Sequence, residues 1–169
     1  FVGMAAWAMD MPFMKRYSSS YLEKHPEKKG QDIETTRRSC EKFKNIPTTI
    51  INFVEGTRVT ADKLKSTKSP FKYLLSPRAG GIAFTLSAMG HLFSGVINVT
   101  LNYPDNKNPT VDILFGRLKR VQVEIELMEV DEAVIGDYFE DVAFKERFQS
   151  WLNGVWQEKD KLLARLNNS

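Results

Sequence analysis

The stretch Thr48-Thr49-Ile50-Ile51-Asn52-Phe53-Val54-Glu55-Gly56-Thr57-Arg58 joins an apolar run to a polar loop. Residues 48–54 are rich in β-branched side chains and follow Pro47, a pattern that predicts a buried strand. A carboxylate, a glycine, a hydroxyl and a guanidinium come next, where an open α/β sheet places ligand-binding groups. Arg58 carries a planar set of donors suited to phosphate, and Gly56 permits either a positive φ or a close approach to a ligand. A simple turn with a surface ion pair is the alternative for this hexapeptide alone.

The rest of the chain predicts an α/β fold, with a mixed, largely parallel sheet flanked by helices, in a single domain over residues 1–169. Apolar residues at helical spacing precede the 48–54 strand, and this strand–helix–strand rhythm favours parallel strands with right-handed crossovers. The elements expected after residue 58 are a polar loop at 59–75, a helix from Ser76 to about Gly90, and strands at 96–101, 111–115 and 121–127, followed by a helix at 140–166.

Two of these elements carry a pattern that predicts which face is buried. Residues 121–127 alternate between apolar and polar side chains, which is typical of an edge or antiparallel strand with one face in solvent. The helix at 140–166 carries an apolar stripe that indicates a core-facing helix rather than a membrane or partner surface. The stripe consists of Phe144, Phe148, Trp151, Leu152, Val155, Trp156, Leu162, Leu163 and Leu166.

Composition limits the classes of function. The chain has 169 residues, 42% hydrophobic and 27% charged, which is ordinary for one globular domain, and its only cysteine, Cys40, excludes an internal disulfide. Residues 1–80 carry 15 basic and 8 acidic residues, and residues 81–169 carry 9 and 13. The basic half favours an anionic lipid head group, an anionic thioester or a membrane surface. We expect no nucleic-acid partner, because no basic-aromatic stacking platform accompanies the charge, and no metal, because the carboxylates and histidines lack ligand spacing.

Several segments together resemble one family, the glycerolipid acyltransferases. The hexapeptide Phe53–Arg58 looks like the third sequence block of that superfamily, and Pro12-Phe13-Met14-Lys15-Arg16 resembles its second block. Tyr73-Leu74-Leu75-Ser76-Pro77-Arg78-Ala79-Gly80-Gly81 resembles a segment found in the branch that contains lysocardiolipin-type enzymes and a bacterial inner-membrane acyltransferase. The ending, Trp151-Leu152-Asn153 and Trp156-Gln157-Glu158-Lys159-Asp160, resembles the bacterial member.

The resemblance implies transfer of a fatty acyl group from acyl-CoA or acyl carrier protein to a lysophospholipid hydroxyl, with no other cofactor. Its substrate-binding residues map onto Arg16, Glu55, Gly56, Thr57 and Arg58, where the two arginines hold the acceptor phosphate. Glu55 orients Arg58 or a polar group of the acceptor, and Gly56 and Thr57 offer hydrogen-bond donors. Further candidates for substrate contacts are Phe13, Lys15 and Arg78. The family's fourth block contains a proline that the strand at 96–101 lacks, which leaves the acceptor preference open.

The family's first block, His-x-x-x-x-Asp, is absent from this chain. His25 is followed five residues later by Gly30, and His91 by Val96, so neither has the required Asp. We therefore expect the fold to be N-terminally truncated here, with the catalytic His and Asp and the membrane helices upstream of Phe1, and the 169 residues to be inactive alone. The resemblance implies the cytoplasmic face of a bacterial inner membrane. A non-catalytic phospholipid- or anion-binding module is the alternative.

Overall fold

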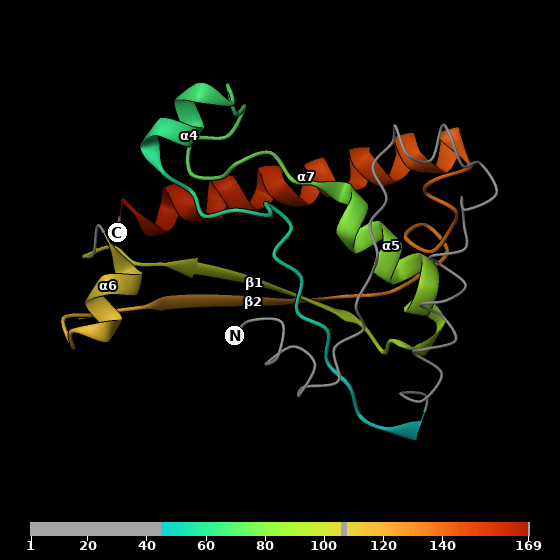
Figure 1. Cartoon of the computed structure of the whole chain (residues 1–169), viewed down its shortest axis with the longest axis horizontal. Coiled ribbons are helices and arrows are strands. Elements are labelled where there is room, and N and C mark those ends of the chain that lie inside the picture. Colours follow the sequence, from blue (N-terminus) through green and yellow to red (C-terminus); the bar gives the residue numbers. More distant parts are fainter. Residues whose placement is uncertain (1–44, 106–107, 169) are drawn as a thin grey trace, which may run out of the picture.

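The computed structural model describes residues 45–105 and 108–168, and a long C-terminal helix dominates it (Figure 1). In chain order the elements are α4 (Ala61–Ser66), α5 (Ala79–Met89), the 3-10 helix η3 (Gly90–Leu92), β1 (Val96–Asn102), α6 (Pro109–Leu114), β2 (Gln122–Met128) and α7 (Val142–Leu166). Helix α7 runs along the β1–β2 pair and contacts both β1 and α5. Within the described ranges, no helix combines the length and the apolar character needed to cross a bilayer.

The described sheet is a two-stranded antiparallel pair. β1 and β2 pair from Val96 opposite Met128 to Asn102 opposite Gln122. This confirms the strands predicted at 96–101 and 121–127, and it confirms the antiparallel option for the second. Because successive side chains alternate between faces, the pair has one polar face, which includes Asn98, and one apolar face. The apolar face exposes Ile97, Val99, Leu101, Val123, Ile125 and Leu127.

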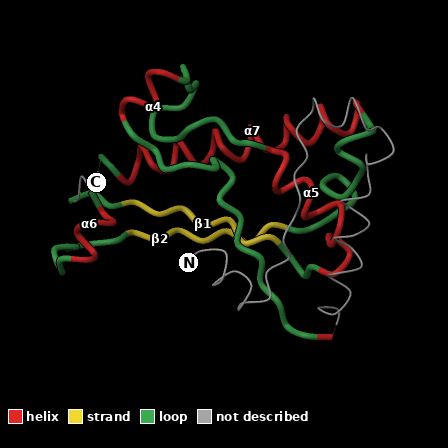
Figure 2. Tube along the Cα trace, viewed as in Figure 1, coloured by secondary structure: helices red, strands yellow, loops and turns green. Residues whose placement is uncertain are grey.

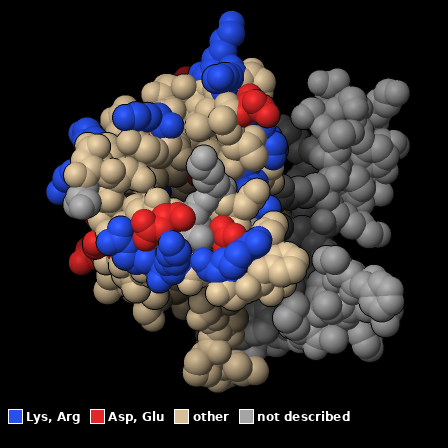
Figure 3. Space-filling model, turned by 90° about the vertical axis from the view of Figure 1, so that its left-hand side faces the viewer, with Lys and Arg blue, Asp and Glu red and all other residues tan. Residues whose placement is uncertain are grey.

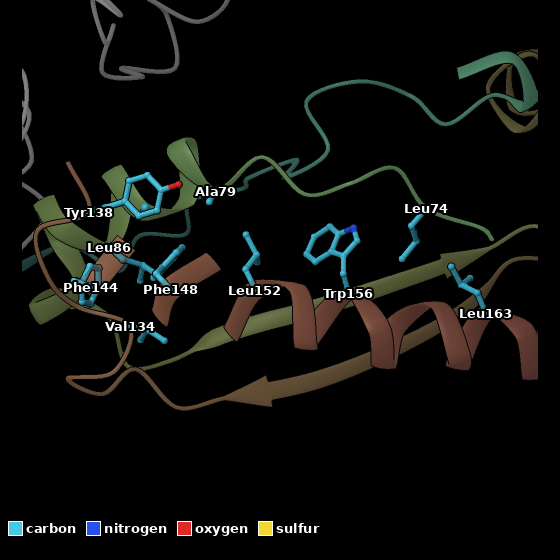
Figure 4. Close-up of a cluster of buried hydrophobic side chains, with 11 residues drawn as sticks. Leu74, Ala79, Leu86, Val134, Tyr138, Phe144, Phe148, Leu152, Trp156 and Leu163 are labelled. Carbon is cyan, nitrogen blue, oxygen red and sulfur yellow. The ribbon is translucent and has the colours of Figure 1, made fainter. Parts of the chain in front are cut away.

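The core lies along α7 and confirms its predicted apolar stripe (Figure 4). Phe148 is fully buried, and it packs in one cluster with Leu86 of α5 and with Val134 and Tyr138 from the segment before α7. The other buried members of the stripe are Phe144, Leu152, Trp156 and Leu163. Asp141 begins α7 by accepting a hydrogen bond from the Phe144 N–H at 3.0 Å. A side-chain cap of this kind satisfies one of the N–H groups that lack a partner inside the helix.

The strand predicted at 48–54 is wrong for the described structure. This segment is an extended loop that passes the β1–β2 pair without joining it (Figure 2). Ile51 is 75% exposed and Phe53 84% exposed, so the run is not buried either. A strand needs a neighbouring edge for its backbone hydrogen bonds, and no described strand besides β1 and β2 offers one. The larger, mainly parallel sheet stays a prediction that the described residues do not test.

Three local predictions differ from the structure in smaller ways. Residues 111–115 were expected as a strand, but Pro109 begins the short helix α6 there, because proline's fixed φ suits the first turn of a helix. Helix α5 begins at Ala79 rather than at Ser76, and its end at Gly90 is confirmed. The loop at 59–75 contains helix α4, capped by the Thr60 hydroxyl, which accepts from the Lys63 N–H at 3.3 Å.

Candidate anion-binding site

The loop that carries the predicted site begins with a tight turn. The Gly56 N–H donates to the Phe53 carbonyl at 2.8 Å, and Gly56 has a φ of +68°. This conformation favours glycine because a Cβ would clash with the backbone. Of the two uses that the sequence allowed for Gly56, the structure has the positive φ. The turn sends the following residues toward α4.

Two segments that resemble the acyltransferase blocks meet at this turn. The Arg78 N–H donates to the Val54 carbonyl at 2.9 Å, and the Leu75 N–H donates to a Glu55 carboxylate oxygen at 3.3 Å. A Cβ placed on Gly56 would lie 3.3 Å from the Arg78 Cδ, so the Arg78 side chain packs against the glycine. Residues 53–58 and 75–78 thus form one unit, which we call the paired loops.

Glu55 connects the paired loops electrostatically to helix α7. Its side chain is half-buried, and this desolvation raises the pKa of the carboxyl, opposed by the hydrogen bond from Leu75 and by the positive charge of Lys159. Lys159 donates to Asn98 Oδ1 and to the Val99 carbonyl, each at 2.8 Å. Burial lowers the pKa of Lys159, and the nearby negative charges of Glu55 and Glu126 oppose that shift.

The next residue of α7 holds the segment just before residues 75–78 of the paired loops. Asp160 accepts hydrogen bonds from two consecutive backbone N–H groups, that of Lys72 at 3.0 Å and that of Tyr73 at 2.7 Å. A carboxylate that accepts two N–H bonds fixes the direction of the chain at that point. Lys159 and Asp160 therefore connect the end of α7 to β1, to Glu55 and to residues 72–73.

The charged end of the loop is exposed. Lys63 of α4 donates from Nζ to the Thr57 hydroxyl at 2.5 Å and to the Arg58 carbonyl at 3.2 Å, which holds the backbone of the loop. The Arg58 side chain itself is at the surface. Among the described residues no ion pair joins Glu55 to Arg58, so the predicted orientation of Arg58 by Glu55 is not seen, because the Glu55 carboxylate turns toward Leu75.

The surroundings of Arg58 are basic. Helix α4 and the residues after it carry Lys63, Lys65, Lys68 and Lys72, and lysine and arginine side chains spread over the end of the molecule that Figure 3 shows, with acidic side chains among them. Arg78 precedes α5 as its exposed N-cap residue, at the end of the helix where the dipole favours anions. This arrangement can bind an anionic group such as a phosphate.

A groove lies between α7 and the polar face of β1–β2. It encloses about 660 Å³ and is lined by polar side chains that include Asn98, Thr100, Glu124, Glu126, Lys159 and Arg165, and by apolar ones that include Trp151, Val155 and Leu162. Lys159 belongs both to this groove and to the contacts around Glu55. The described residues contain no group of three or more His, Cys, Asp or Glu side chains arranged to hold a metal ion.

The structure brings together only part of the predicted site. Glu55, Gly56, Thr57 and Arg58 lie in one loop with Arg78 against it. Phe13, Lys15 and Arg16, predicted as substrate contacts, lie outside the described residues, as do Cys40 and the helix expected before residue 45. The pairing of Arg16 with Arg58 around one phosphate therefore stays a prediction.

Lys159 and Asp160 carry no motif that assigns them a role from the sequence alone. Both stand in the ending that resembles the bacterial acyltransferase, and both lie on an otherwise amphipathic helix. Two oppositely charged neighbours beside a buried stripe are a weak signal, since most such charges are solvated. Their partners at residues 72–73 and 98–99 are more than 50 positions away in the sequence, so only the fold reveals them.

The described residues thus place an exposed arginine, Arg58, on a loop held by hydrogen bonds, which suits an anionic ligand. Comparison with known proteins points to the kind of ligand. The chain is 26% identical over 164 residues to 2-acyl-1-lysophosphatidylinositol acyltransferase of Saccharomyces cerevisiae, covering 89% of this chain and 41% of the relative. It is 31% identical over 120 residues to 1-acyl-sn-glycerol-3-phosphate acyltransferase gamma of Mus musculus, covering 65% of this chain and 30% of the relative. It is 26% identical over 141 residues to the delta form of Homo sapiens, covering 77% of this chain and 35% of the relative.

These relatives support the resemblance to the glycerolipid acyltransferase superfamily. The chain spans less than half of the length of each of them. No protein-family model matches the chain, and no solved structure matches it either.

Proposed function

We propose that this chain is part of an acyltransferase that moves a fatty acyl group from acyl-CoA or acyl carrier protein to the hydroxyl of a lysophospholipid. The observation that carries the proposal is the braced loop that leaves Arg58 at the surface, in a sequence related to lysophospholipid acyltransferases. In this role Arg58, together with Arg16, binds the phosphate of the acceptor, and Arg78 adds positive charge beside them.

The chemistry needs a base, an oxyanion site and a positioned acceptor. The base removes the proton from the acceptor hydroxyl while its oxygen attacks the thioester carbonyl, and the tetrahedral oxyanion collapses to an ester as the thiolate leaves. The thiolate then takes up a proton. The described residues contribute the third requirement, since a phosphate held at Arg58 fixes where the hydroxyl lies. Neither histidine has the Asp five residues later that the family's base requires, so the 169 residues alone should not turn over substrate.

Arg58→Ala tests the assignment in the protein expressed from its full reading frame. Loss of a charge-assisted contact of about 1.5–3 kcal/mol should lower kcat/KM for a lysophosphatidate by about tenfold to a hundredfold. The matched control is Arg147→Ala, which removes an exposed arginine of α7 that lies over Phe144, and which should leave kcat/KM unchanged. Unaltered kinetics in the Arg58 variant, with normal folding, would contradict the role given to Arg58.

A non-catalytic anion-binding module would keep the same exposed loop with Arg58 and lack the acyl-transfer chemistry. The missing His-x-x-x-x-Asp pattern favours it for these 169 residues taken alone. The two functions separate when the full-reading-frame protein is given labelled acyl-CoA and a lysophospholipid. Product formation supports the enzyme, while saturable lipid binding without product supports the module. The proposed location is the cytoplasmic face of a bacterial inner membrane, which rests on the resemblance in the sequence and which cell fractionation would test.

A further inference from the structure

We propose that the connection between β1 and β2 inserts its tip into the interface of an anionic lipid bilayer. The tip consists of Ile113, Leu114 and Phe115, at the end of α6, and we call it the α6 tip. This inference concerns how the protein contacts a membrane, so it goes beyond acyl transfer and can hold if the proposed acyl transfer fails.

The α6 tip exposes three consecutive large apolar side chains. Ile113 is 56% exposed, Leu114 78% and Phe115 70%. Single exposed apolar residues are common on protein surfaces, but three in a row on a projecting turn leave an apolar surface that water solvates poorly. In Figure 1, α6 lies beyond the ends of β1 and β2, at the far end of the hairpin from α5. A narrow projection of this kind can enter a bilayer interface without moving the rest of the fold.

The tip is rigid by its own contacts. The Arg117 N–H and the Leu118 N–H both donate to the Asp112 carbonyl, at 2.7 and 3.2 Å, and Gly116 turns the chain with a φ of +64°. The Arg117 side chain pairs with Asp112 at 3.3 Å and lies over the Phe115 ring at 5.0 Å. A preformed tip loses little conformational entropy when it inserts, and this favours insertion over a loop that must first fold.

Basic residues follow the tip directly. Residues 108–121 contain Arg117, Lys119 and Arg120 against the single acidic residue Asp112, and Arg120 also pairs with Asp105 at 3.4 Å. All three basic residues are exposed, so their charges lie at the surface, where an anionic bilayer would attract them. Apolar side chains at a tip with cations just behind it match the layering of an anionic bilayer surface, with acyl chains below and head groups above.

The same end of the molecule carries the proposed anion site. Figure 1 places α4, which holds the Arg58 loop through Lys63, toward the same end as α6, and Figure 3 shows this end with its spread of basic side chains. An isolated apolar tip could also fit a protein partner. The excess of basic residues over acidic ones in residues 108–121 argues for the lipid, because anionic bilayers attract basic segments.

Co-sedimentation of the 169-residue chain with vesicles tests the proposal. We expect binding to vesicles of phosphatidylcholine with about 30% phosphatidylglycerol, and weaker binding to pure phosphatidylcholine. Phe115→Ser should weaken binding to the mixed vesicles by about tenfold, and Leu114→Ser by a similar factor. The matched control is Val142→Ser, which removes a 69% exposed apolar residue at the start of α7. Equal binding by Phe115→Ser and Val142→Ser, or no binding to either kind of vesicle, would overturn the proposal.

A labelled residue shows directly whether the tip enters the lipid. With Cys40 replaced by alanine, Leu114→Cys carries a polarity-sensitive fluorophore, and Val142→Cys carries the same label in a separate control protein. Vesicles should shift the emission of the label at 114 to shorter wavelength and leave the label at 142 unchanged. Bound protein without a shift at 114 would show that another surface makes the contact. Self-association that Phe115→Ser abolishes, in protein that binds no vesicles, would assign the tip to a second copy instead.

Discussion

Two turns of this molecule look alike and are held in different ways. The turn at Gly56 and the turn at Gly116 each place a glycine at positive φ, +68° and +64°, shortly before an exposed arginine. The first depends on residues far away in the sequence, at Leu75, Arg78 and α7. The described contacts of the second are local and join Arg117 to Asp112 and to Phe115. A loop that binds one specific ligand needs a fixed geometry, which contacts with distant residues provide. The α6 tip, which we propose to enter a fluid bilayer, needs only to stay folded.

The largest expected effect on stability comes from removing a large side chain from the core beneath the first turn. Phe148 is fully exposed on unfolding and fully buried in the fold, so Phe148→Ala should lower the free energy of unfolding by about 3–5 kcal/mol. Urea denaturation followed by far-UV circular dichroism measures this. Val142→Ala, on the exposed face of the same helix, should change stability by less than about 0.5 kcal/mol. Similar losses in the two variants would mean that α7 does not form the core.

A smaller effect separates the two turns directly. Asp160→Ala leaves the N–H groups of Lys72 and Tyr73 without their acceptor, which should cost about 1–3 kcal/mol, at the lower end because Lys72 is exposed to water. Amide hydrogen exchange should quicken at residues 72–78, which include the partners of Val54 and Glu55.

The residues around Gly116 share no contact with Asp160, so exchange at 117–118 should not change in that variant. Glu158→Ala is the matched control, because its exposed pair with Lys161 is worth little. The account of a braced first turn and an independent second turn fails if amides in both turns quicken equally in Asp160→Ala.

The two glycines give a matched pair of substitutions. Gly56→Ala and Gly116→Ala each force an L-residue into the left-handed region, at a cost of about 1–2 kcal/mol. At Gly56 the new Cβ would also lie 3.3 Å from the Arg78 Cδ, whereas at Gly116 nothing lies within 4 Å. Thermal unfolding should therefore show the larger loss for Gly56→Ala. A larger loss for Gly116→Ala would contradict the packing of Arg78 against the first turn.

The smallest effect is a dependence of stability on pH around Glu55. Its pKa is raised above 4.5 in the fold, chiefly by burial, so the native state binds more protons there than the unfolded state. Its contribution to stability is therefore fully present below the unfolded pKa and is lost as the pH rises through the folded pKa. Lys159 acts in the alkaline range. Burial lowers its pKa below 10.5, so stability rises as the pH climbs from the folded value toward 10.5.

Glu55→Gln should change both parts of this pH profile. The loss of stability that accompanies ionisation of Glu55 as the pH rises should disappear. The pKa of Lys159 should fall further, because a negative charge that favours its protonated form is gone. The difference in melting temperature between the parent and the variant, measured from pH 4 to about pH 10, isolates these groups from the other titrating residues. A difference that does not vary with pH would contradict the burial of Glu55 against α7.

The sequence predicted some elements well because their patterns are local. Helix α7 has a long apolar stripe and an Asp N-cap, and the alternation at 121–127 is enough to indicate a strand with one solvated face. The run at 48–54 misled because β-branched residues show a preference for strands, but pairing depends on partners elsewhere. Likewise, residues 111–115 have a strand-like composition, but Pro109 begins a helix that includes most of them.

The candidate site divides in the same way. The hexapeptide indicated a turn glycine at Gly56 and a candidate anion-binding arginine at Arg58, because glycine and arginine have characteristic uses in turns and anion sites. The structure has the positive φ at Gly56. The bracing by Lys159 and Asp160 could not, since hydrogen bonds between residues more than 50 positions apart leave no periodic signal. The direction in which the Glu55 carboxylate turns is likewise set by the Leu75 N–H and not by its neighbours in sequence.

Isothermal titration calorimetry would show whether Arg58 binds an acceptor phosphate, with a short-chain, water-soluble lysophosphatidate titrated into the 169-residue chain. We predict saturable binding, which Arg58→Ala weakens about tenfold or more and Arg147→Ala leaves unchanged. The matching monoacylglycerol, which lacks the phosphate, should not bind. Equal affinity in parent and Arg58→Ala, or equal binding of the monoacylglycerol, would contradict an acceptor-phosphate site at Arg58.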